Sequence, residues 1–348
     1  MTATKLRLIS AFSFAFVLVV SYSASAADAV EEFYSKNSVS LIVGYSAPSG
    51  YHNWARLVGK YMTKYMPGHP NFIIKDMPGA GSLTSGNFIA NQAPKDGLTM
   101  GVFSRNLPTQ ILLGLPNANF DPRELDYIGS PEKQPTVACA AIDSSGVRSV
   151  EDLQKKELLV GGTGPAGGSS FLPLMINQLA GAKFKLVDGY KSVGEIYLAM
   201  QRGELGGVCQ GYLPIYGPNK ELVDSGRIKF LFNFEAKRDP TIVGNPPSIY
   251  EYVKDEASRQ ILDFFNASPA IGRPFAAPKG IPAERLAALR KAFNAGVNDP
   301  EFGEEAKKLQ LEAGLVTGEE VVNIIKSIYA FPKPVLERAA AMQPKEGG

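Results

Sequence analysis

The chain has 348 residues, of which 45% are apolar and 20% are charged, an ordinary composition for a globular protein long enough for two domains. Its 36 basic and 34 acidic side chains are mixed along the chain and give a net charge of +2. The sequence has no basic run with interleaved aromatic residues, which argues against nucleic acid as a partner.

The first 26 residues have the pattern of a cleavable export signal. Lys5 and Arg7 precede an apolar run from Leu8 to Val20, and Ala24-Ser25-Ala26 is a small-residue cleavage site. The run of about 13 residues is short for a membrane helix, which needs roughly 20, although an uncleaved anchor is the alternative. We therefore expect export to the periplasm and removal of residues 1–26.

Short β-rich runs then alternate with helical patterns, as in a parallel sheet covered by helices. The first predicted strands are 40–45, 71–77 and 98–103, with helices over 53–65 and 82–91. The alternation starts again with strands 157–163, 184–190 and 205–212 and with helices over 170–180 and 193–201. Two α/β units therefore follow one another.

The last third of the chain reads as helices, predicted over 282–298, 300–309 and 318–341 with no strand between them. Pro282 and Pro300 suit the first turn of a helix. Segments 136–142 and 264–273 are apolar and extended enough to cross between domains. We expect residues 1–26 to be removed, a discontinuous lobe over 27–137 plus 271–348, and a second lobe over 138–270 that includes crossover segments.

Cys139 and Cys209 both lie in apolar, strand-like segments. In an oxidising compartment they are compatible with one disulfide, and buried free thiols are the equal alternative. Two cysteines and two histidines, His52 and His69, lie far apart along the chain, so the spacing gives no metal site.

Three turns rich in small residues each follow a predicted strand and precede a predicted helix. They are Ala47-Pro48-Ser49-Gly50, Pro78-Gly79-Ala80-Gly81-Ser82 and the run from Gly162 to Ser170. Unpaired backbone N–H groups at a helix start suit an anion, and glycine lets the backbone approach a ligand closely. Most such loops bind nothing, but three that face one cleft between domains could hold a molecule with a carboxylate at each end.

Six segments together carry a resemblance to a known family. They are, in chain order, GYSAPSGYHNWARL, DMPGAGSL, APKDGLTMG, GGTGPAGGSS, DGYKSVGEIYLAMQRGEL and NDPEFGEEAKKLQLE. The chain resembles the extracytoplasmic solute receptors of tripartite tricarboxylate transporters, the TctC/Bug family, over nearly all of its length after the signal segment. The PGAG step and the spacing of the other segments make the match specific.

The resemblance implies an α/β, two-lobed periplasmic binding protein fold (type II-like), each lobe a mainly parallel sheet flanked by helices with the ligand cleft between the lobes. It also implies a receptor, not an enzyme, that needs no cofactor. Such a receptor captures a carboxylate-bearing small molecule, a di- or tricarboxylate or an aromatic acid, and delivers it to the membrane permease subunits of the transporter. We expect a monomer.

In the family, loops of both lobes hold the ligand largely through backbone N–H groups and water. The positions that match them here are Ser49, Gly50, Tyr51, Gly79, Ala80, Gly81, Ser82, Gly164, Gly167, Gly168, Ser169, Ser170, Tyr190 and Lys191. The chain departs from the family where Pro48 and Ser49 replace glycines, where His52 stands at the place of an aspartate, and where Gln210-Gly211-Tyr212 replaces a Phe-Asp-Asn-like segment. The identity of the ligand therefore stays open.

Several of these side chains have an ordinary structural alternative. His52 could contact a ligand carboxylate, or it could cap or pack its helix. Arg105, just after a predicted strand, could pair bidentately with a carboxylate or form a surface salt bridge. Lys191 could reach the ligand or stand solvated at a helix start. With Tyr212, these complete the candidate ligand-binding residues.

Two rival functions remain. Gly162 to Gly167 satisfies G-x-G-x-x-G, and Asp188 follows Gly167 by 21 residues at the end of the next predicted strand, as in a dinucleotide-binding unit. An exported oxidoreductase is therefore an alternative, opposed by Pro165 in the turn and by the lack of a hydride-transfer constellation. The other rival is a receptor that senses the ligand for a signalling partner instead of feeding a permease.

Overall fold

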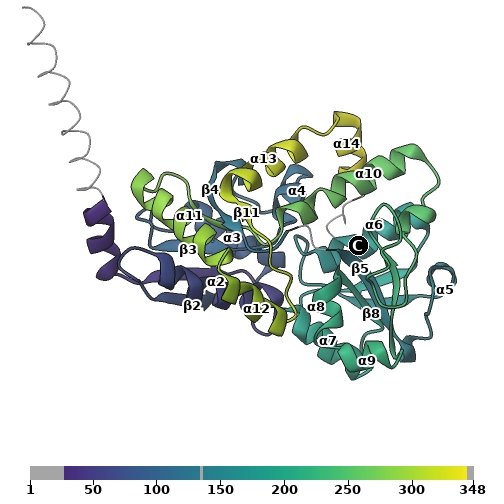
Figure 1. Cartoon of the computed structure of the whole chain (residues 1–348). Helices are drawn as coiled ribbons and strands as arrows, with labels where there is room; N and C mark the ends of the chain where they lie inside the picture. Colours follow the sequence, from purple (N-terminus) through teal and green to yellow (C-terminus); the bar gives the residue numbers. More distant parts are fainter. Residues whose placement is uncertain (1–26, 134–135, 343–348) are drawn as a thin grey trace, which may run out of the picture.

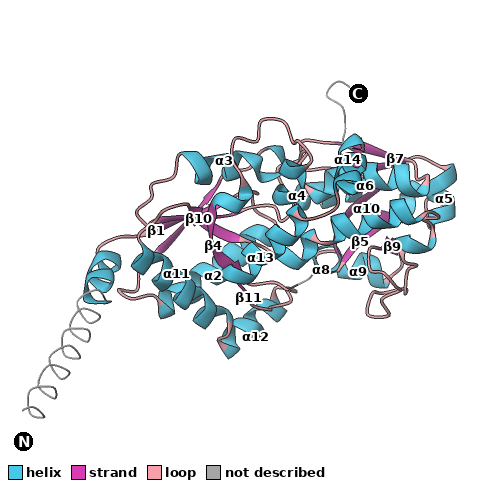
Figure 2. Cartoon of the chain, turned by 90° about the horizontal axis from the view of Figure 1, so that it is seen from above, coloured by secondary structure: helices cyan, strands magenta, loops and turns pink. Residues whose placement is uncertain are grey.

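The computed structural model describes residues 27–133 and 136–342, so the predicted signal segment lies outside the described residues. The chain forms two sheets, each flanked by helices, that lie side by side (Figure 1; seen from above in Figure 2). We call the six-stranded sheet with its helices lobe 1 and the five-stranded sheet with its helices lobe 2. Helical residues 27–35 precede the first strand.

The sheet of lobe 1 has the order β11-β4-β10-β3-β1-β2. Its strands are β1 (Val39–Val43), β2 (Phe72–Asp76), β3 (Thr99–Val102), β4 (Leu125–Ser130), β10 (Phe275–Pro278) and β11 (Val316–Thr317). Strand β1 pairs in parallel with β2 and β3, whereas β10 lies antiparallel between β3 and β4. The residues that precede β10 therefore lie at the edge where β3 and β4 end.

The helices of lobe 1 are α2 (Gly50–Tyr65), α3 (Leu83–Asn91), α4 (Leu107–Leu112), α11 (Ala283–Val297), α12 (Pro300–Lys308), α13 (Gly318–Tyr329) and α14 (Lys333–Ala341). Helix α2 begins three residues earlier than predicted, because the Ser49 hydroxyl caps it by accepting a 3.2 Å hydrogen bond from the His52 N–H. The apolar face of α2 packs on α11 and α12, where Trp54 is fully buried and stacks on Phe302.

The sheet of lobe 2 has the order β7-β6-β8-β5-β9. Its strands are β5 (Val137–Ile142), β6 (Leu158–Gly161), β7 (Phe184–Val187), β8 (Gly207–Gly211) and β9 (Ile228–Asn233). Its helices are α5 (Val150–Lys155), α6 (Gly168–Ala180), α7 (Val193–Gln201), α8 (Tyr212–Tyr216), α9 (Lys220–Asp224) and α10 (Glu256–Asn266). Strand β6 is parallel to β7 and β8, and β5 is antiparallel to β8 and β9.

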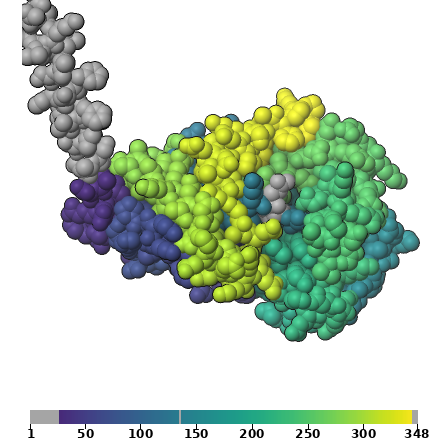
Figure 3. All heavy atoms as spheres, viewed as in Figure 1, coloured from purple at the N-terminus to yellow at the C-terminus, as the bar shows by residue number. Residues whose placement is uncertain are grey.

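The two-lobed α/β prediction is confirmed, since strands from both ends of the described chain build one sheet and strands from its middle build the other. The antiparallel strands β5 and β10 are those next to the two passages between lobes. Helix α14 packs against α10, as Figure 1 shows, and in Figure 3 the yellow atoms of the C-terminal part of the chain adjoin green atoms of lobe 2. The residue boundaries of the two lobes stay a prediction.

Four details of the sequence-based prediction are wrong. The sheets were expected to be mainly parallel, but both are mixed, because the strands next to the passages between lobes, β10 and β5, run antiparallel to their neighbours. The helix expected over 318–341 is two helices, because Pro332 fixes its own φ, lacks an N–H and disfavours a helical Phe331. The segment 264–273 is not extended, since it contains the end of α10 and a helical turn, Ser268–Ile271. The two-residue strand β11 lies in the last third, where no strand was expected; a piece so short leaves no periodicity to detect.

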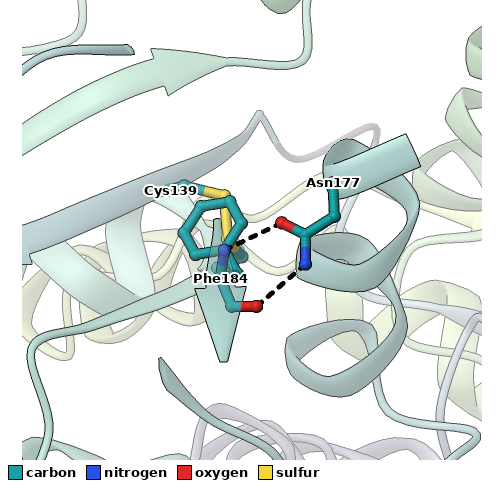
Figure 4. The surroundings of a disulfide bond; sticks show 4 residues. Cys139, Asn177 and Phe184 are labelled. Atoms are coloured by element: carbon teal, nitrogen blue, oxygen red, sulfur yellow. Dashed lines mark hydrogen bonds between the residues drawn. A yellow bond between two sulfur atoms is a disulfide. The ribbon is translucent and has the colours of Figure 1, made fainter. Parts of the chain in front are cut away.

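A disulfide joins Cys139 of β5 to Cys209 of β8 in the core of lobe 2 (Figure 4). The two cysteines are directly opposite each other in the antiparallel pair, with Cα atoms 4.0 Å apart. Nearby, the Asn177 side chain makes two 2.8 Å hydrogen bonds to the backbone of Phe184, joining α6 to the start of β7. Of the two alternatives left open by the sequence, the structure has the disulfide.

Removing this disulfide should destabilise the protein measurably. The bond spans 70 residues, and closing a loop of that length in the unfolded chain corresponds to roughly 4 kcal/mol in the chain-entropy description. We expect the double variant Cys139→Ser, Cys209→Ser to lose about 2–4 kcal/mol of unfolding free energy in a urea titration. Reduced wild-type protein is the control and should lose a similar amount. Two titratable thiols in the unreduced, denatured wild type would contradict the pairing.

Candidate functional site

A cavity lies between the two sheets and is lined by residues of both lobes. It encloses about 730 Å³ of space that no protein atom fills, part of which is open solvent. Its lining residues are Tyr45, Gly50, Tyr51, Ser104, Arg105, Asn106, Val137, Thr163, Gly168, Ser169, Phe171, Leu172, Val193, Gln210, Gly211, Pro214, Phe234, Phe265, Asn266, Pro269 and Arg273. A molecule held there would touch both lobes.

Two arginines and one glutamate form a buried cluster at this cavity. The Arg273 Nε donates to Glu132 Oε2 at 2.8 Å, and the Arg105 Nη1 donates to the same oxygen at 3.3 Å. The exposed fractions of Arg105, Arg273 and Glu132 are 6%, 5% and 4%. Arg105 follows β3, Glu132 follows β4 and Arg273 precedes β10 between them, so the order of the sheet brings the three together.

The charges of the two arginines affect each other. Burial lowers the pKa of the Arg105 guanidinium, and the positive charge of Arg273 lowers it further. Burial lowers the pKa of the Arg273 guanidinium as well. The Glu132 carboxylate and then Tyr51 raise this pKa by more than burial lowers it, so the net shift is upward. An arginine stays protonated in proteins, so the cluster has two positive charges and one negative charge.

Two tyrosines fix the positions of the arginines. The rings of Tyr45 and Tyr51 stack with their centroids 4.6 Å apart, and the Arg273 guanidinium lies 4.2 Å from the centroid of the Tyr51 ring. A cation over an aromatic face is attracted by the ring quadrupole, more strongly when water is excluded. The Tyr51 hydroxyl also accepts a 3.2 Å hydrogen bond from the backbone N–H of Arg105. Tyr51 therefore joins the start of α2 to both arginines.

The first predicted ligand loop contributes only in part to the cavity. Gly50 and Tyr51 line it, whereas the Ser49 hydroxyl caps α2. The His52 Nδ1 lies 3.0 Å from Asp76 Oδ1, at the end of β2, and His52 is not among the residues that line the cavity. The structure thus gives Ser49 and His52 partners within the protein.

The second predicted loop meets the third one across the junction of the lobes. The backbone N–H of Gly81 donates to the Thr163 carbonyl at 2.8 Å, and the Ser104 hydroxyl donates to the Ala166 carbonyl at 3.0 Å. Gly79 and Ala80 precede this contact, and the Ser82 hydroxyl accepts a 2.6 Å hydrogen bond from the Ser104 N–H. Residues 79–82 are absent from the described lining of the cavity, so this turn meets lobe 2 instead.

The third loop is held by hydrogen bonds of its own. The Gly164 N–H donates to Asp188 Oδ1 at 2.7 Å and to the Ser170 hydroxyl at 3.0 Å, and the Gly167 N–H donates to the Gly164 carbonyl. Only Gly168 and Ser169 of the predicted residues in this loop line the cavity. Because Asp188 bonds to the turn itself, it is not placed as a ribose-binding acid would be, and this opposes the dinucleotide alternative.

The remaining predicted residues lie outside the lining. The Tyr190 N–H donates to the Gly162 carbonyl, and Lys191 is exposed. Tyr212 packs on Tyr216 and Phe230, and its hydroxyl accepts a 3.4 Å hydrogen bond from the Val243 N–H. Among the predicted residues, the cavity brings together Gly50, Tyr51, Arg105, Gly168 and Ser169. Their role in binding stays a prediction.

The sequence reading missed Arg273, Glu132 and Tyr45. Arg273 lies within a segment taken as a crossing between domains, and its position beside Arg105 depends on β10 inserting between β3 and β4. An arginine two residues before a short apolar run, in GRPFAAP, was the available signal. Nothing local marks Glu132 as the partner of either arginine.

The described residues contain neither a candidate metal site nor a candidate membrane-spanning helix. No three His, Cys, Asp or Glu side chains within residues 27–133 and 136–342 are close enough to share a metal ion. In the same part of the chain, no helix combines the length and the apolar character needed to cross a membrane.

The fold is similar to that of solved solute-binding proteins. MatC (Rpa3494) from Rhodopseudomonas palustris with bound malate is 16% identical, with a TM-score of 0.67 over 87% of this chain and 98% of that one. R. palustris Rpa4515 with adipate is 18% identical, with a TM-score of 0.68 over 88% and 98%. The periplasmic binding protein BugD is 18% identical, with a TM-score of 0.66 over 88% and 98%.

At these identities the likeness establishes the fold, a two-lobed periplasmic binding protein fold. No family model matches the sequence. No curated protein matches it either. The function must therefore be argued from the site.

The contact between the two glycine turns gives a prediction about the arrangement of the lobes. Gly81 has φ +67°, and a Cβ there would collide with Gly167 N and lie 2.6 Å from the carbonyl carbon of Ala166 in the other lobe. We expect Gly81→Ala to hold the lobes apart, seen as a larger radius of gyration in small-angle scattering without ligand.

Gly181→Ala is the matched control, because Gly181 also has φ +67° but has no atom within 4 Å of the added Cβ. In both variants the free energy of unfolding should fall by about 1–2 kcal/mol, because alanine is strained in the left-handed backbone conformation. Equal radii for the two variants and the wild type would mean that this turn does not set the distance between the lobes.

Proposed function

We propose that the protein is an extracytoplasmic solute receptor that captures a carboxylate-bearing small molecule between its two lobes. The observation that supports this most directly is the cavity between the lobes, with two buried guanidinium groups that share one carboxylate. Arginine is well suited to bind carboxylates, because its N–H groups can donate to both oxygens at once. A ligand that neutralises the excess positive charge would stabilise the closed site.

The likeness in fold supports the same proposal. Two proteins with this fold have been solved with malate or adipate, both dicarboxylates. The sequence resemblance to the TctC/Bug receptors points to the same class. We propose accordingly that the protein works in the periplasm after removal of residues 1–26, binds its ligand without chemical reaction, and delivers it to the permease subunits of a tripartite tricarboxylate transporter.

A receptor of this kind should be stabilised by its own ligand class. A ligand that binds only the folded state stabilises that state by roughly 2.7 kcal/mol when its free concentration is about 100 times its dissociation constant. In a thermal melting screen we expect mono-, di- or tricarboxylates to raise the melting midpoint. The corresponding amides and alcohols should leave the midpoint unchanged. A screen in which only uncharged solutes raise the midpoint would contradict the carboxylate claim.

A further inference from the structure

The charges around the cavity leave one unit of positive charge without a partner. Arg105 and Arg273 both line it, and their shared partner Glu132 lies behind them. None of the described lining residues is Asp, Glu, Lys or His. A buried charge without a counter-charge is costly, so the cavity as built favours one further negative charge.

Beyond the two arginines, no cationic side chain is among the described lining residues, so a second negative charge would have no counter-charge there. Lobe 2, including its helix α10, supplies an apolar surface. The residues are Val137, Phe171, Leu172, Phe234 and Phe265. Such a surface stabilises an apolar ligand body by removing it from water.

Several polar side chains of the wall already have protein partners. The Ser104 hydroxyl donates to the Ala166 carbonyl, Thr163 Oγ1 lies 3.2 Å from Ser169 Oγ, and Asn266 Nδ2 donates to the Phe234 carbonyl at 2.6 Å. The Gln210 amide bonds to the Tyr197 hydroxyl. A second ligand carboxylate bound by these side chains would have to displace these bonds.

A neighbouring hollow adds a repulsive element. It shares Val137, Phe234, Asn266 and Pro269 with the cavity and is also lined by Glu235 and Asp263. Burial raises the pKa of the Glu235 carboxyl, and the nearby Asp239 raises it further, so negative charge is already disfavoured there. A carboxylate that extended past the apolar wall would approach two acidic side chains.

We infer that the ligand is a monocarboxylate with an apolar body, whose carboxylate binds the Arg105 and Arg273 guanidinium groups and whose body lies against Phe171, Phe234 and Phe265. The inference rests on the proposed function and narrows its substrate class. It separates this chain from the neighbours that were solved with dicarboxylates. Tyr51, Tyr45 and Glu132 hold the two arginines in place for this contact.

Matched pairs of probes test the number of charges. Hexanoate and adipate have the same six-carbon chain with one or two carboxylates, and hexanamide has none; benzoate, terephthalate and benzamide form a second set. In calorimetric titration of the mature protein we expect each monocarboxylate to bind at least about tenfold more tightly than its dicarboxylate partner, a difference of 1.4 kcal/mol. The amides should not bind measurably.

Two variants test the arginine cluster. Arg105→Met leaves the Arg273–Glu132 pair intact and lowers the net charge of the cluster from +1 to 0, so the monocarboxylate should bind about ten- to a hundredfold more weakly. Arg202→Met is the control, because Arg202 is exposed and pairs with Glu204 at the surface. Glu132→Gln raises the net charge to +2, and the preference for hexanoate over adipate should shrink or reverse. Circular dichroism establishes that each variant is folded.

The outcomes separate the inference from the function on which it rests. Tighter binding of adipate and terephthalate by the wild type would overturn the inference and leave a carboxylate receptor. Unchanged affinity in folded Arg105→Met would also overturn it, because the carboxylate would then be held elsewhere. Binding of neither acid in either set, with no stabilisation by other carboxylates, would overturn the proposed function itself.

Discussion

The site depends on one carboxylate oxygen shared by two buried arginines. Glu132 follows β4, Arg105 follows β3 and Arg273 precedes β10, so the cluster ties together three neighbouring strands of lobe 1 at the edge that faces lobe 2. Removing one partner of a buried ion pair typically costs 3–5 kcal/mol, because the other charge is left without compensation. The cluster therefore constrains the lobe as well as supplying charge to the cavity.

The contact between the glycine turns is a second constraint, and it acts between the lobes. Gly81 donates to the Thr163 carbonyl, and at both Gly81 and Gly164 a Cβ would collide with the opposite turn. The turns were expected to approach a ligand closely. In the structure each approaches the other turn instead, so glycine is required by the close packing of two backbones.

The sequence predicted the elements better than the site. The alternation of β-rich runs with helical patterns located β1, β2, β3, β6, β7 and β8, because each is a clear β-rich run. The passages between lobes were harder: β10 is four residues long, and its place between β3 and β4 is set by tertiary packing. Arg105 could be proposed as a ligand-binding residue because a recognisable strand precedes it. The places of Arg273 and Glu132 beside Arg105 become clear only when the strand order is known.

Ser49 and His52, two candidate ligand-binding residues, have partners within the protein instead. Ser49 was a candidate because it matches a ligand loop of the family, and His52 because an imidazole there could contact a ligand carboxylate. Local chemistry competes for both side chains. A serine before a helix caps it, and a histidine in the first turn can reach an acid at the end of the neighbouring parallel strand, here Asp76. Such local pairings are common enough that a candidate polar residue at a helix start needs support from the tertiary structure.

If the protein is a receptor as proposed, the excess charge of the cluster would connect ligand binding to closure of the lobes. When the lobes are apart, water can solvate the guanidinium groups of Arg105 and Arg273, and a net charge of +1 costs little. When the lobes meet at the glycine turns, as in this structure, the two arginines are only 6% and 5% exposed, and the same charge becomes more costly unless an anion enters with it. An anion in the cavity therefore favours the closed arrangement more than the open one, and this difference in affinity is what shifts a two-state equilibrium. The buried arginine pair thus provides a physical reason for the closed state to depend on the ligand.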